Sequence, residues 1–192
     1  MTTYPVRTRH WTRKEYDRLV EIGLLHEDEP IELLGGQLIV AEPKGTPHTT
    51  AVGLTADALR VAFGPGWVVR VQDAVALDVE SEPEPDVVVV PGGHRDYRAE
   101  HPSRISLLVE VADWSLAFDR RHKGGLYARA GVADYWIVNL VDETLEVYRR
   151  PAPDPSAEFG WRYLDAETFR AGIHVSPLAR PDVTLAVVDL LP

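Results

Sequence analysis

The segment 105–140 constrains the fold of this chain more than any other part of its sequence. It reads as a buried strand over 105–112, an amphipathic helix over 115–130, and a second buried strand over 134–140. A strand, a helix and a strand joined by such short connections place the two strands side by side and parallel, with a right-handed crossover. We therefore expect the sheet of this protein to be mixed.

Two helices and a hairpin are predicted in the part of the chain that precedes this unit. A capping-box pattern predicts a helix over 12–24, and an acidic turn follows at 26–30. Gly35 and Gly36 lie between two short apolar runs, a composition typical of a β-hairpin. A Thr-Pro start and a glycine stop predict a second helix over 46–63.

Strands account for most of the remaining sequence. A long strand is predicted over 67–79 and a short one, buried on both faces, over 86–90, with an acidic, proline-rich turn between them. Short peripheral strands are expected at 145–149, 161–164 and 173–175. With both ends set aside, the predicted order is helix, strand, strand, strand, helix, strand.

The whole chain, residues 1–192, is expected to form one α/β domain with a core at about 46–140, because it contains no internal repeat and no long linker. A chain of this length buries roughly 70% of its unfolded surface, so it needs neither a disulfide nor a metal in order to fold. Any metal is therefore expected to serve chemistry. Apolar runs are too short to cross a bilayer and no signal peptide is evident, so we expect a cytoplasmic protein.

Three acidic residues, Glu32, Asp86 and Glu110, interrupt apolar segments. A buried carboxylate is costly unless it is paired or binds a metal. If strand 86–90 runs antiparallel to strand 105–112, Asp86 and Glu110 converge, and a divalent cation would relieve their repulsion. Oxygen ligands of this kind favour Mg²⁺ or Mn²⁺. The alternative is that each carboxylate forms salt bridges with arginines at a strand end.

Lys123 is expected to reach the same site from the helix that follows Glu110. It shares a helix face with Asp119 and Tyr127, at intervals of four residues. The chain advances about 10 Å from Glu110 to the end of its strand and returns about 10 Å along the helix to Lys123. Lys123 is therefore predicted to lie level with Glu110, although a solvated lysine paired with Asp119 is the alternative.

These residues carry a resemblance to a known family of proteins. The order of elements, with Asp86 and Glu110 on successive core strands, resembles the PD-(D/E)xK nuclease superfamily, which includes restriction endonucleases. The chain further resembles the Uma family of restriction endonuclease-like proteins, a former domain of unknown function. The resemblance covers roughly residues 16–140 and rests on the segments ELLGGQL, PEPDVVV, LLVEVAD and SLAFDRRHKGGLYARAGVADYWIVNL.

The resemblance implies a metal-dependent nuclease with a restriction-endonuclease-like core. It implies that Asp86 and Glu110 bind Mg²⁺ or Mn²⁺, that Glu32 is a further acidic member of the catalytic site, and that Lys123 lies beside them. In such a site the cation activates a water molecule for attack on a phosphodiester, and the lysine orients that water or offsets developing charge.

Two positions depart from the pattern of the superfamily. The pattern places a lysine two residues after the glutamate, but this chain has Ala112 there. Residues 110 and 112 share a face of the strand, so the missing ammonium would have pointed at the metal. Lys123 is the expected replacement. Trp114 stands where a small residue is expected, and it would crowd the entrance of the site.

The acidic balance of the chain weighs against tight binding of nucleic acid. The formal net charge is −10, whereas proteins that hold phosphates usually present a basic face. We keep three interpretations: an endonuclease that binds DNA weakly, a catalytically idle interaction module with a nuclease fold, and a phosphodiesterase acting on RNA or a small substrate. The retained carboxylates and lysine favour an enzyme, and exposed hairpins and peripheral strands suggest a homodimer.

Other polar residues have weaker predicted roles. His48 is expected to be a solvated neighbour of a helix start, with phosphate binding or proton transfer as the alternative. Gln72 is a candidate to face the site. Arg120 and Arg121 either contact backbone phosphates or form ordinary surface pairs. The aromatic residues expected in the core are Tyr127, Tyr135 and Trp136.

Overall fold

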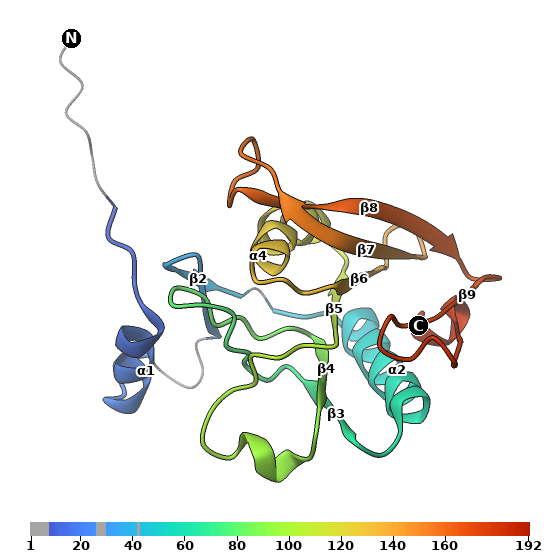
Figure 1. Cartoon of the computed structure of the whole chain (residues 1–192), viewed down its shortest axis with the longest axis horizontal. Coiled ribbons are helices and arrows are strands. Elements are labelled where there is room, and N and C mark those ends of the chain that lie inside the picture. Colours follow the sequence, from blue (N-terminus) through green and yellow to red (C-terminus); the bar gives the residue numbers. More distant parts are fainter. Residues whose placement is uncertain (1–7, 26–29, 42) are drawn as a thin grey trace.

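A mixed sheet of six strands forms the centre of the protein (Figure 1). The computed structural model describes residues 8–25, 30–41 and 43–192. In their order across the sheet, the strands are β3 (Trp67–Val71), β4 (Val87–Pro91), β5 (Leu107–Ala112), β6 (Asp134–Asn139), β7 (Thr144–Pro153) and β8 (Trp161–Arg170). Strands β5 and β6 are parallel, and every other neighbouring pair in this sheet is antiparallel.

The crossover from β5 to β6 is helical, as the sequence predicts. It consists of α3 (Leu116–Phe118), a π-helical turn (Asp119–Lys123) and α4 (Gly124–Arg129). The predicted parallel pair and the mixed α/β fold class are therefore confirmed. The predicted helix over 115–130 is confirmed as well, except that its middle turn is wider than an α-helical turn.

Helices cover the two faces of the central strands, and the alternation of side chains decides which face each residue meets (Figure 1). Odd-numbered residues of β4 and β5, such as Val87 and Val109, pack with α2 (Thr46–Phe63). Even-numbered residues face the other way, and Leu108 packs with Tyr127 of α4. Glu110 also has an even number, so the strand directs its carboxylate toward α4.

The N-terminal helix and hairpin are present but shorter than predicted. Helix α1 (Arg13–Glu21) begins at the expected capping box of Thr12 and ends three residues before the predicted end. Strands β1 (Ile31–Leu34) and β2 (Gln37–Val40) form the predicted antiparallel hairpin. The acidic turn predicted at 26–30 lies almost entirely outside the described residues.

The strand predicted over 67–79 is wrong in its second half. Gln72 adopts a left-handed φ of 51°, and its amide N–H donates to the carbonyl oxygens of Pro85 and Asp86, both at 3.2 Å. The chain therefore leaves the sheet at this point. Apolar residues beyond this point are still buried; Val75, for example, packs in a small separate cluster. Their burial without strand pairing explains why the sequence pattern suggested a longer strand.

The strands predicted at 145–149 and 161–164 are present, but they are longer than predicted. Strands β7 and β8 have ten residues each, and they pair with one another as a direct extension of the central sheet. Prolines within β7 and exposed polar residues on β8 masked their length, because proline normally interrupts a strand. The strand expected at 173–175 is confirmed as β9 (His174–Val175), which pairs with β10 (Leu185–Ala186). Short 3₁₀ turns occur at His94–Tyr97 and Val187–Leu190.

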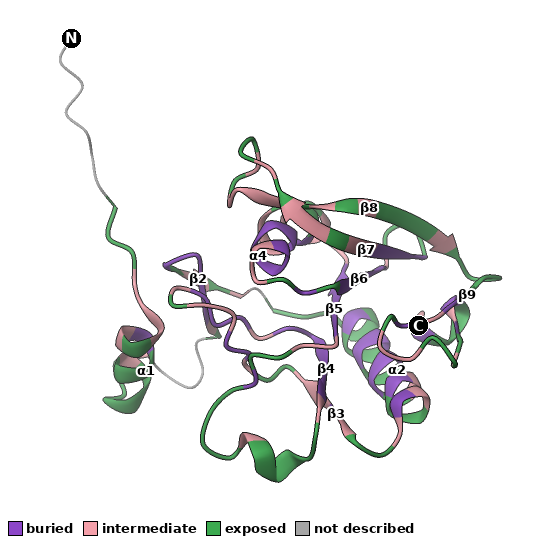
Figure 2. Cartoon of the chain, in the orientation of Figure 1, coloured by how far each residue is buried: buried purple, intermediate pink, exposed green. Residues whose placement is uncertain are grey.

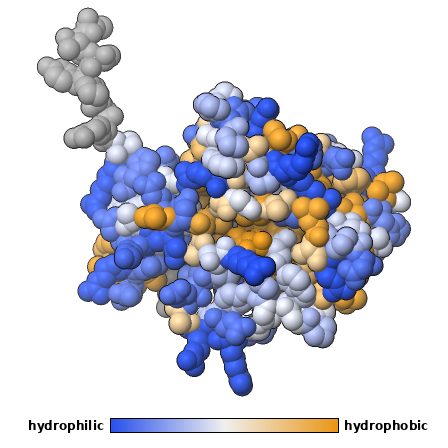
Figure 3. All heavy atoms as spheres, viewed as in Figure 1, coloured by the Kyte–Doolittle hydropathy of each residue, from blue (hydrophilic) through white to orange (hydrophobic). Residues whose placement is uncertain are grey.

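Burial is concentrated in the central strands and in the inward faces of α2 and α4, whereas α1 is largely exposed (Figure 2). In the space-filling view, apolar side chains gather near the centre of one face and hydrophilic ones surround them (Figure 3). Within the described ranges, no helix combines the length and the apolar character that a membrane crossing requires.

Candidate functional site

The antiparallel pairing of β4 and β5 brings Asp86 and Glu110 together. Val87 lies opposite Val109, so the next pair outward along the two strands is Asp86 and Glu110. The backbone N–H of Asp86 donates to Glu110 Oε2 at 3.4 Å, and the N–H of Val111 donates to Asp86 Oδ2 at 2.9 Å. Both acidic residues are buried. The predicted convergence of the two carboxylates is therefore found in the structure.

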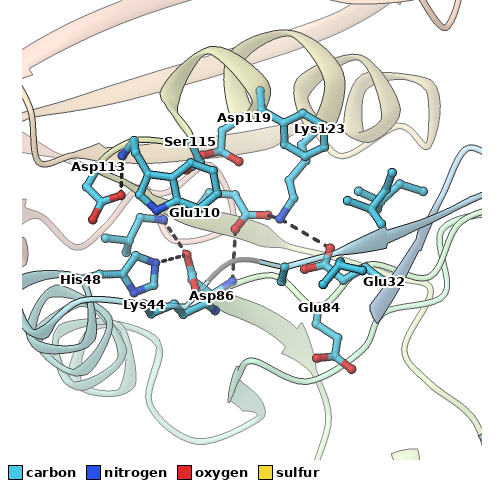
Figure 4. Close-up of a pocket in the computed structure, with 17 residues that line it drawn as sticks. Glu32, Lys44, His48, Glu84, Asp86, Glu110, Asp113, Ser115, Asp119 and Lys123 are labelled. Carbon is cyan, nitrogen blue, oxygen red and sulfur yellow. Dashed lines mark hydrogen bonds and ion pairs between the residues drawn. The ribbon is translucent and has the colours of Figure 1, made fainter. Parts of the chain in front are cut away.

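Lys123 reaches these carboxylates from the π-helical turn (Figure 4). Its Nζ lies 3.1 Å from Glu110 Oε1 and 3.5 Å from Glu32 Oε2. The ammonium therefore bridges two carboxylates that come from different strands. The lysine thus lies level with Glu110, as predicted from the rise per residue of the strand and the helix. Ala112, the position that lacks the expected lysine, is fully buried on the same face of β5.

Glu32 enters the site from the hairpin, which is tied to the rest of the protein by a bridge between Leu33 and Glu82. Its side chain is largely buried, and Oε2 has no hydrogen-bond partner apart from the ion pair with Lys123. A buried carboxylate oxygen that lacks a hydrogen-bond donor favours the binding of a cation or a water molecule beside it.

Asp86 is surrounded by donors that the sequence indicates only weakly or not at all. Lys44 Nζ lies 2.9 Å from Oδ1, His48 Nε2 lies 3.1 Å from Oδ2, and the amide of Gln72 donates to Oδ1 at 3.4 Å. The expectation that His48 is a solvated neighbour of the helix start is wrong, because α2 turns its ring inward and buries it. Gln72 faces the site as suggested, and its left-handed backbone directs it there.

Tyr127 is buried as expected, but its hydroxyl also donates to Glu110 Oε1 at 2.5 Å. A tyrosine on an apolar helix face is normally predicted to be a core residue, and this prediction takes no account of the hydrogen bond that its hydroxyl forms. Lys123 and Tyr127 lie four residues apart on the same helix face, and both side chains bond the carboxylate of Glu110. Tyr135 and Trp136 are fully buried, as predicted.

The alternative of arginine salt bridges at strand ends is not what the structure shows. Among the described residues, the cationic partners of Asp86, Glu110 and Glu32 are lysines and one histidine. Arg120 instead forms a paired hydrogen bond with Glu146 on β7, away from the carboxylates.

Burial and mutual charge perturb the ionisation of the site. Burial acts to raise the pKa of Asp86, but the hydrogen bond from His48 and the charge of Lys44 outweigh it and hold that pKa well below its usual range. Burial raises the pKa of Glu110 to about 8, against the opposing effect of the Lys123 ammonium. Two adjacent carboxyls whose pKa values are driven apart in this way are typical of functional sites.

Lys123 itself remains charged. Burial acts to lower the pKa of its ammonium, yet the negative charges of Glu110 and Glu32 raise that pKa well above its usual value. Burial also raises the pKa of Asp119 to about 6, opposed by Lys123 and by the hydroxyl of Ser115. The site therefore combines a permanently charged ammonium with carboxyls that differ in their affinity for protons.

A cavity of about 340 Å³, within the size range of ligand-binding pockets, is lined by Glu32, His48, Asp86, Glu110 and Lys123. Its charged and polar lining includes Lys44, Glu84 and Asp119 in addition to the residues described above (Figure 4). Glu84 was not predicted as part of the site, because it lies within the acidic, proline-rich segment that reads as a solvated turn. Its pKa is raised by burial and by the nearby charge of Glu32.

The donor set suits a hard divalent cation that keeps part of its water shell. No three His, Cys, Asp or Glu side chains among residues 8–25, 30–41 and 43–192 are grouped closely enough to hold an ion alone. Mg²⁺ is commonly bound by only one or two carboxylates, with waters and substrate phosphate completing its coordination. Asp86 and Glu110 supply such a pair, and the weak 3.4 Å contact leaves Glu110 Oε2 available.

A central mixed sheet, a helical crossover and carboxylates on two adjacent strands define a protein of the restriction-endonuclease-like fold class. The model of the Uma2 family, described as "Putative restriction endonuclease", matches residues 13–187, and the chain belongs to this family. A solved structure with the same fold is that of a putative nuclease belonging to DUF820 from Anabaena variabilis ATCC 29413. It has a TM-score of 0.66 and 17% sequence identity over 90% of this chain and 96% of that one. No curated protein matches the chain.

Proposed function

We propose that this protein is a metal-dependent endonuclease that hydrolyses phosphodiester bonds of DNA. The observation that carries the proposal is the meeting of Asp86 and Glu110 across β4 and β5, with the ammonium of Lys123 at 3.1 Å from Glu110. A purely structural core has little reason to bury two carboxylates and a lysine in one cavity, since each charge is costly to remove from water. Family membership supports the same conclusion.

In this proposal Asp86 and Glu110 hold Mg²⁺ or Mn²⁺, which when bound supplies Lewis-acid polarisation of the phosphoryl oxygen and a water of lowered pKa. Lys123 places a fixed positive charge beside the phosphate and offsets the negative charge that develops there. Tyr127 donates to Glu110 and fixes the orientation of its carboxylate. Glu32 holds the other side of the ammonium and keeps Lys123 directed into the cavity.

The partners of Asp86 have a positioning role. Lys44 and His48 each bond one carboxylate oxygen, and together they keep Asp86 ionised, which is the form that binds a cation. Lys44 is also partly exposed at the cavity, with a side chain 36% accessible, so it is placed to contact an incoming phosphate.

The proposal is tested by nuclease assays with single-stranded and plasmid DNA in the presence of Mg²⁺, Mn²⁺ or EDTA. We expect cleavage only with a divalent cation, and its loss in Asp86→Asn and in Glu110→Gln. Asp57→Asn, an exposed carboxyl on α2, is the matched control and should cleave like the wild type. Titration calorimetry should show that both site variants lose Mn²⁺ binding while retaining the circular dichroism spectrum of the wild type.

Three outcomes would contradict the proposal. Cation-dependent cleavage that persists in both site variants would place the chemistry elsewhere. Mn²⁺ binding without cleavage of DNA would favour the phosphodiesterase on RNA or a small substrate, and absence of both would favour the idle interaction module, a reading that the net charge of −10 also supports.

A further inference from the structure

Trp114 is an exposed aromatic residue at the edge of the carboxylate cavity. Its accessible fraction is 63%, and it lines the same cavity as Asp86 and Glu110. It lies two residues after the end of β5 and four residues beyond Glu110 along the chain. In the described part of the chain its indole forms no aromatic pair and lies under no arginine, whereas the partly buried Trp67 and Trp11 each have such a partner.

We propose that Trp114 stacks on an unpaired nucleobase next to the scissile phosphate, so that the substrate of the site is a single-stranded nucleic acid. This inference rests on the proposed function, because it assigns the substrate class of the same site. The flat face of an indole binds any base by stacking, and each such contact contributes substantially to single-strand affinity.

The remaining walls of the cavity favour a base rather than a second phosphate. Ile39 and Val40 of β2 and Phe118 of α3 line it together with Trp114, so the lining combines apolar side chains with the carboxylates. An apolar wall beside a charged site separates the two halves of a nucleotide, with the phosphate near the ions and the base on the apolar side.

The charge of the molecule points to the same kind of substrate. A duplex is held largely through many phosphate contacts, which require a broad basic surface. This chain has a net charge of −10, and the cations of the cavity are already paired with carboxylates. Stacking supplies affinity without additional positive charge. It also requires an exposed base face, and in a continuous duplex neighbouring base pairs cover those faces.

The test compares binding and cleavage by the wild type, Trp114→Ala and Trp114→Phe. The ligands are a fluorescein-labelled DNA 12-mer, the same sequence as a blunt duplex, and the same sequence as RNA. Binding is measured by fluorescence anisotropy with Ca²⁺, and cleavage is measured with Mg²⁺. We expect the wild type to prefer a single strand. Trp114→Ala should lose roughly 5- to 100-fold in single-strand affinity, the range that one base stack provides. Trp114→Phe should recover most of that loss.

Duplex binding should be the same in all three proteins. Val141→Ala is the matched control, because Val141 is also 63% exposed but lies on the β6–β7 turn outside the cavity. A second ligand is a 12-mer with one abasic nucleotide next to the cleavage site. The wild type should bind this strand as weakly as Trp114→Ala binds the intact strand. The relative loss with DNA and with RNA tells which sugar the site accepts.

Equal effects of Trp114→Ala on duplex and single strand, or no effect on either, would overturn the stacking role even if cleavage is observed. Loss of cleavage in every protein with the stacking pattern intact would instead overturn the proposed function alone. A concentration-dependent change of oligomeric state in Trp114→Ala, measured by light scattering and without any change in nucleic-acid binding, would assign Trp114 to a contact between copies of this chain.

Discussion

Lys123 is the residue on which the proposed chemistry depends most directly. Its side chain is 11% exposed and lies between two buried carboxylates from different strands. An ammonium in this position is held by its hydrogen bond to Glu110 and by the negative charges of Glu110 and Glu32, which compensate its desolvation. The same charge faces the cavity, where a phosphate would gain negative charge during hydrolysis.

Substitution of Lys123 by methionine should therefore remove catalysis while leaving the cation site in place. Methionine preserves most of the apolar length of the side chain but carries no charge. We expect the rate of cleavage to fall by about 10²- to 10³-fold, as on removal of one transition-state donor. Mn²⁺ affinity measured by calorimetry should remain within about tenfold, since lysine ligates no metal.

Lys14→Met is the matched control for this experiment, because Lys14 lies on the exposed side of α1. It should leave both cleavage and Mn²⁺ binding unchanged. A fully active Lys123→Met enzyme would show that the helix lysine serves only to neutralise buried acids.

Asp119 gives a test of the electrostatics that does not depend on activity. Burial raises its folded-state pKa to about 6 from 3.8, so the folded protein binds this proton more tightly than the unfolded chain. The associated stability is fully present below pH 3.8 and is lost as the pH rises through 6. The ionised side chain thus destabilises the fold at neutral pH.

Asp119→Asn removes this ionisation and should be measured by urea denaturation between pH 4 and 8. Relative to the wild type, the variant is expected to gain stability as the pH rises, by about 3 kcal/mol at most. Asp57→Asn should show no such gain. A difference between wild type and Asp119→Asn that stays constant with pH would mean that Asp119 titrates in the folded protein as it does in the unfolded chain.

At the scale of elements, the π-helical turn Asp119–Lys123 determines how the crossover helix meets the sheet. The N–H of Gly124 donates to the carbonyl oxygen of Asp119, five residues back, instead of four. One extra residue is thereby accommodated in the helix, a feature that is frequent at functional sites. It allows both Asp119 and Lys123 to face the cavity while Tyr127 of α4 still reaches Glu110.

Insertion of one alanine after Arg121 adds a residue that the wide turn, which already absorbs one, does not take up, so it should rotate the segment before it relative to Lys123 by about 100°. Asp119 and Ser115 would then turn away from the cavity. We expect a folded protein with an unchanged helical circular dichroism signal and loss of cleavage. Arg121→Ala keeps the length of the turn and should stay active. An active insertion variant would show that the register of this turn has no part in forming the site.

The sequence predicted the elements that meet at the site better than it predicted their surroundings. Buried runs of β-branched residues and the length of the crossover determine β4, β5 and β6, and simple rise per residue places Lys123 beside Glu110. The contacts of Lys44 and Tyr127 were not predictable in this way. Lys44 lies in a connection without periodicity, and the polar end of Tyr127 cannot be distinguished from an ordinary core tyrosine.

The errors at element ends have a common physical cause. Tertiary packing fixes where the strand after Trp67 leaves the sheet, and it also supports β7 despite its prolines. Local composition carries neither piece of information, because strand preference depends strongly on the neighbours that a strand packs against. The π-helical turn is likewise invisible in the pattern, since residues four apart share a face in either kind of helix to a first approximation.

At the scale of the whole molecule, the acidic balance limits how the proposed nuclease would hold nucleic acid. A basic groove neutralises many phosphates and loses affinity steeply as salt rises, with a logarithmic slope of about −0.7 per phosphate for single strands. This protein has 20 basic and 30 acidic residues, and the cations of the cavity are paired with carboxylates. The protein can therefore neutralise only a few phosphates of a bound strand directly.

We accordingly expect single-stranded DNA to bind weakly in EDTA and at least about tenfold more tightly with Mg²⁺ or Ca²⁺, because a bound cation adds the positive charge that the site otherwise lacks. The salt dependence with the divalent cation should be shallow, with a slope of about −1.4 to −2.1, which corresponds to two or three phosphates. Anisotropy titrations between 50 and 300 mM KCl measure both quantities on one labelled strand. The divalent effect should vanish in Glu110→Gln and persist in Asp57→Asn, since only the former removes a proposed ligand. Tight binding in EDTA with a steep slope would contradict this account, because it would require a basic surface that acts independently of the carboxylate cavity.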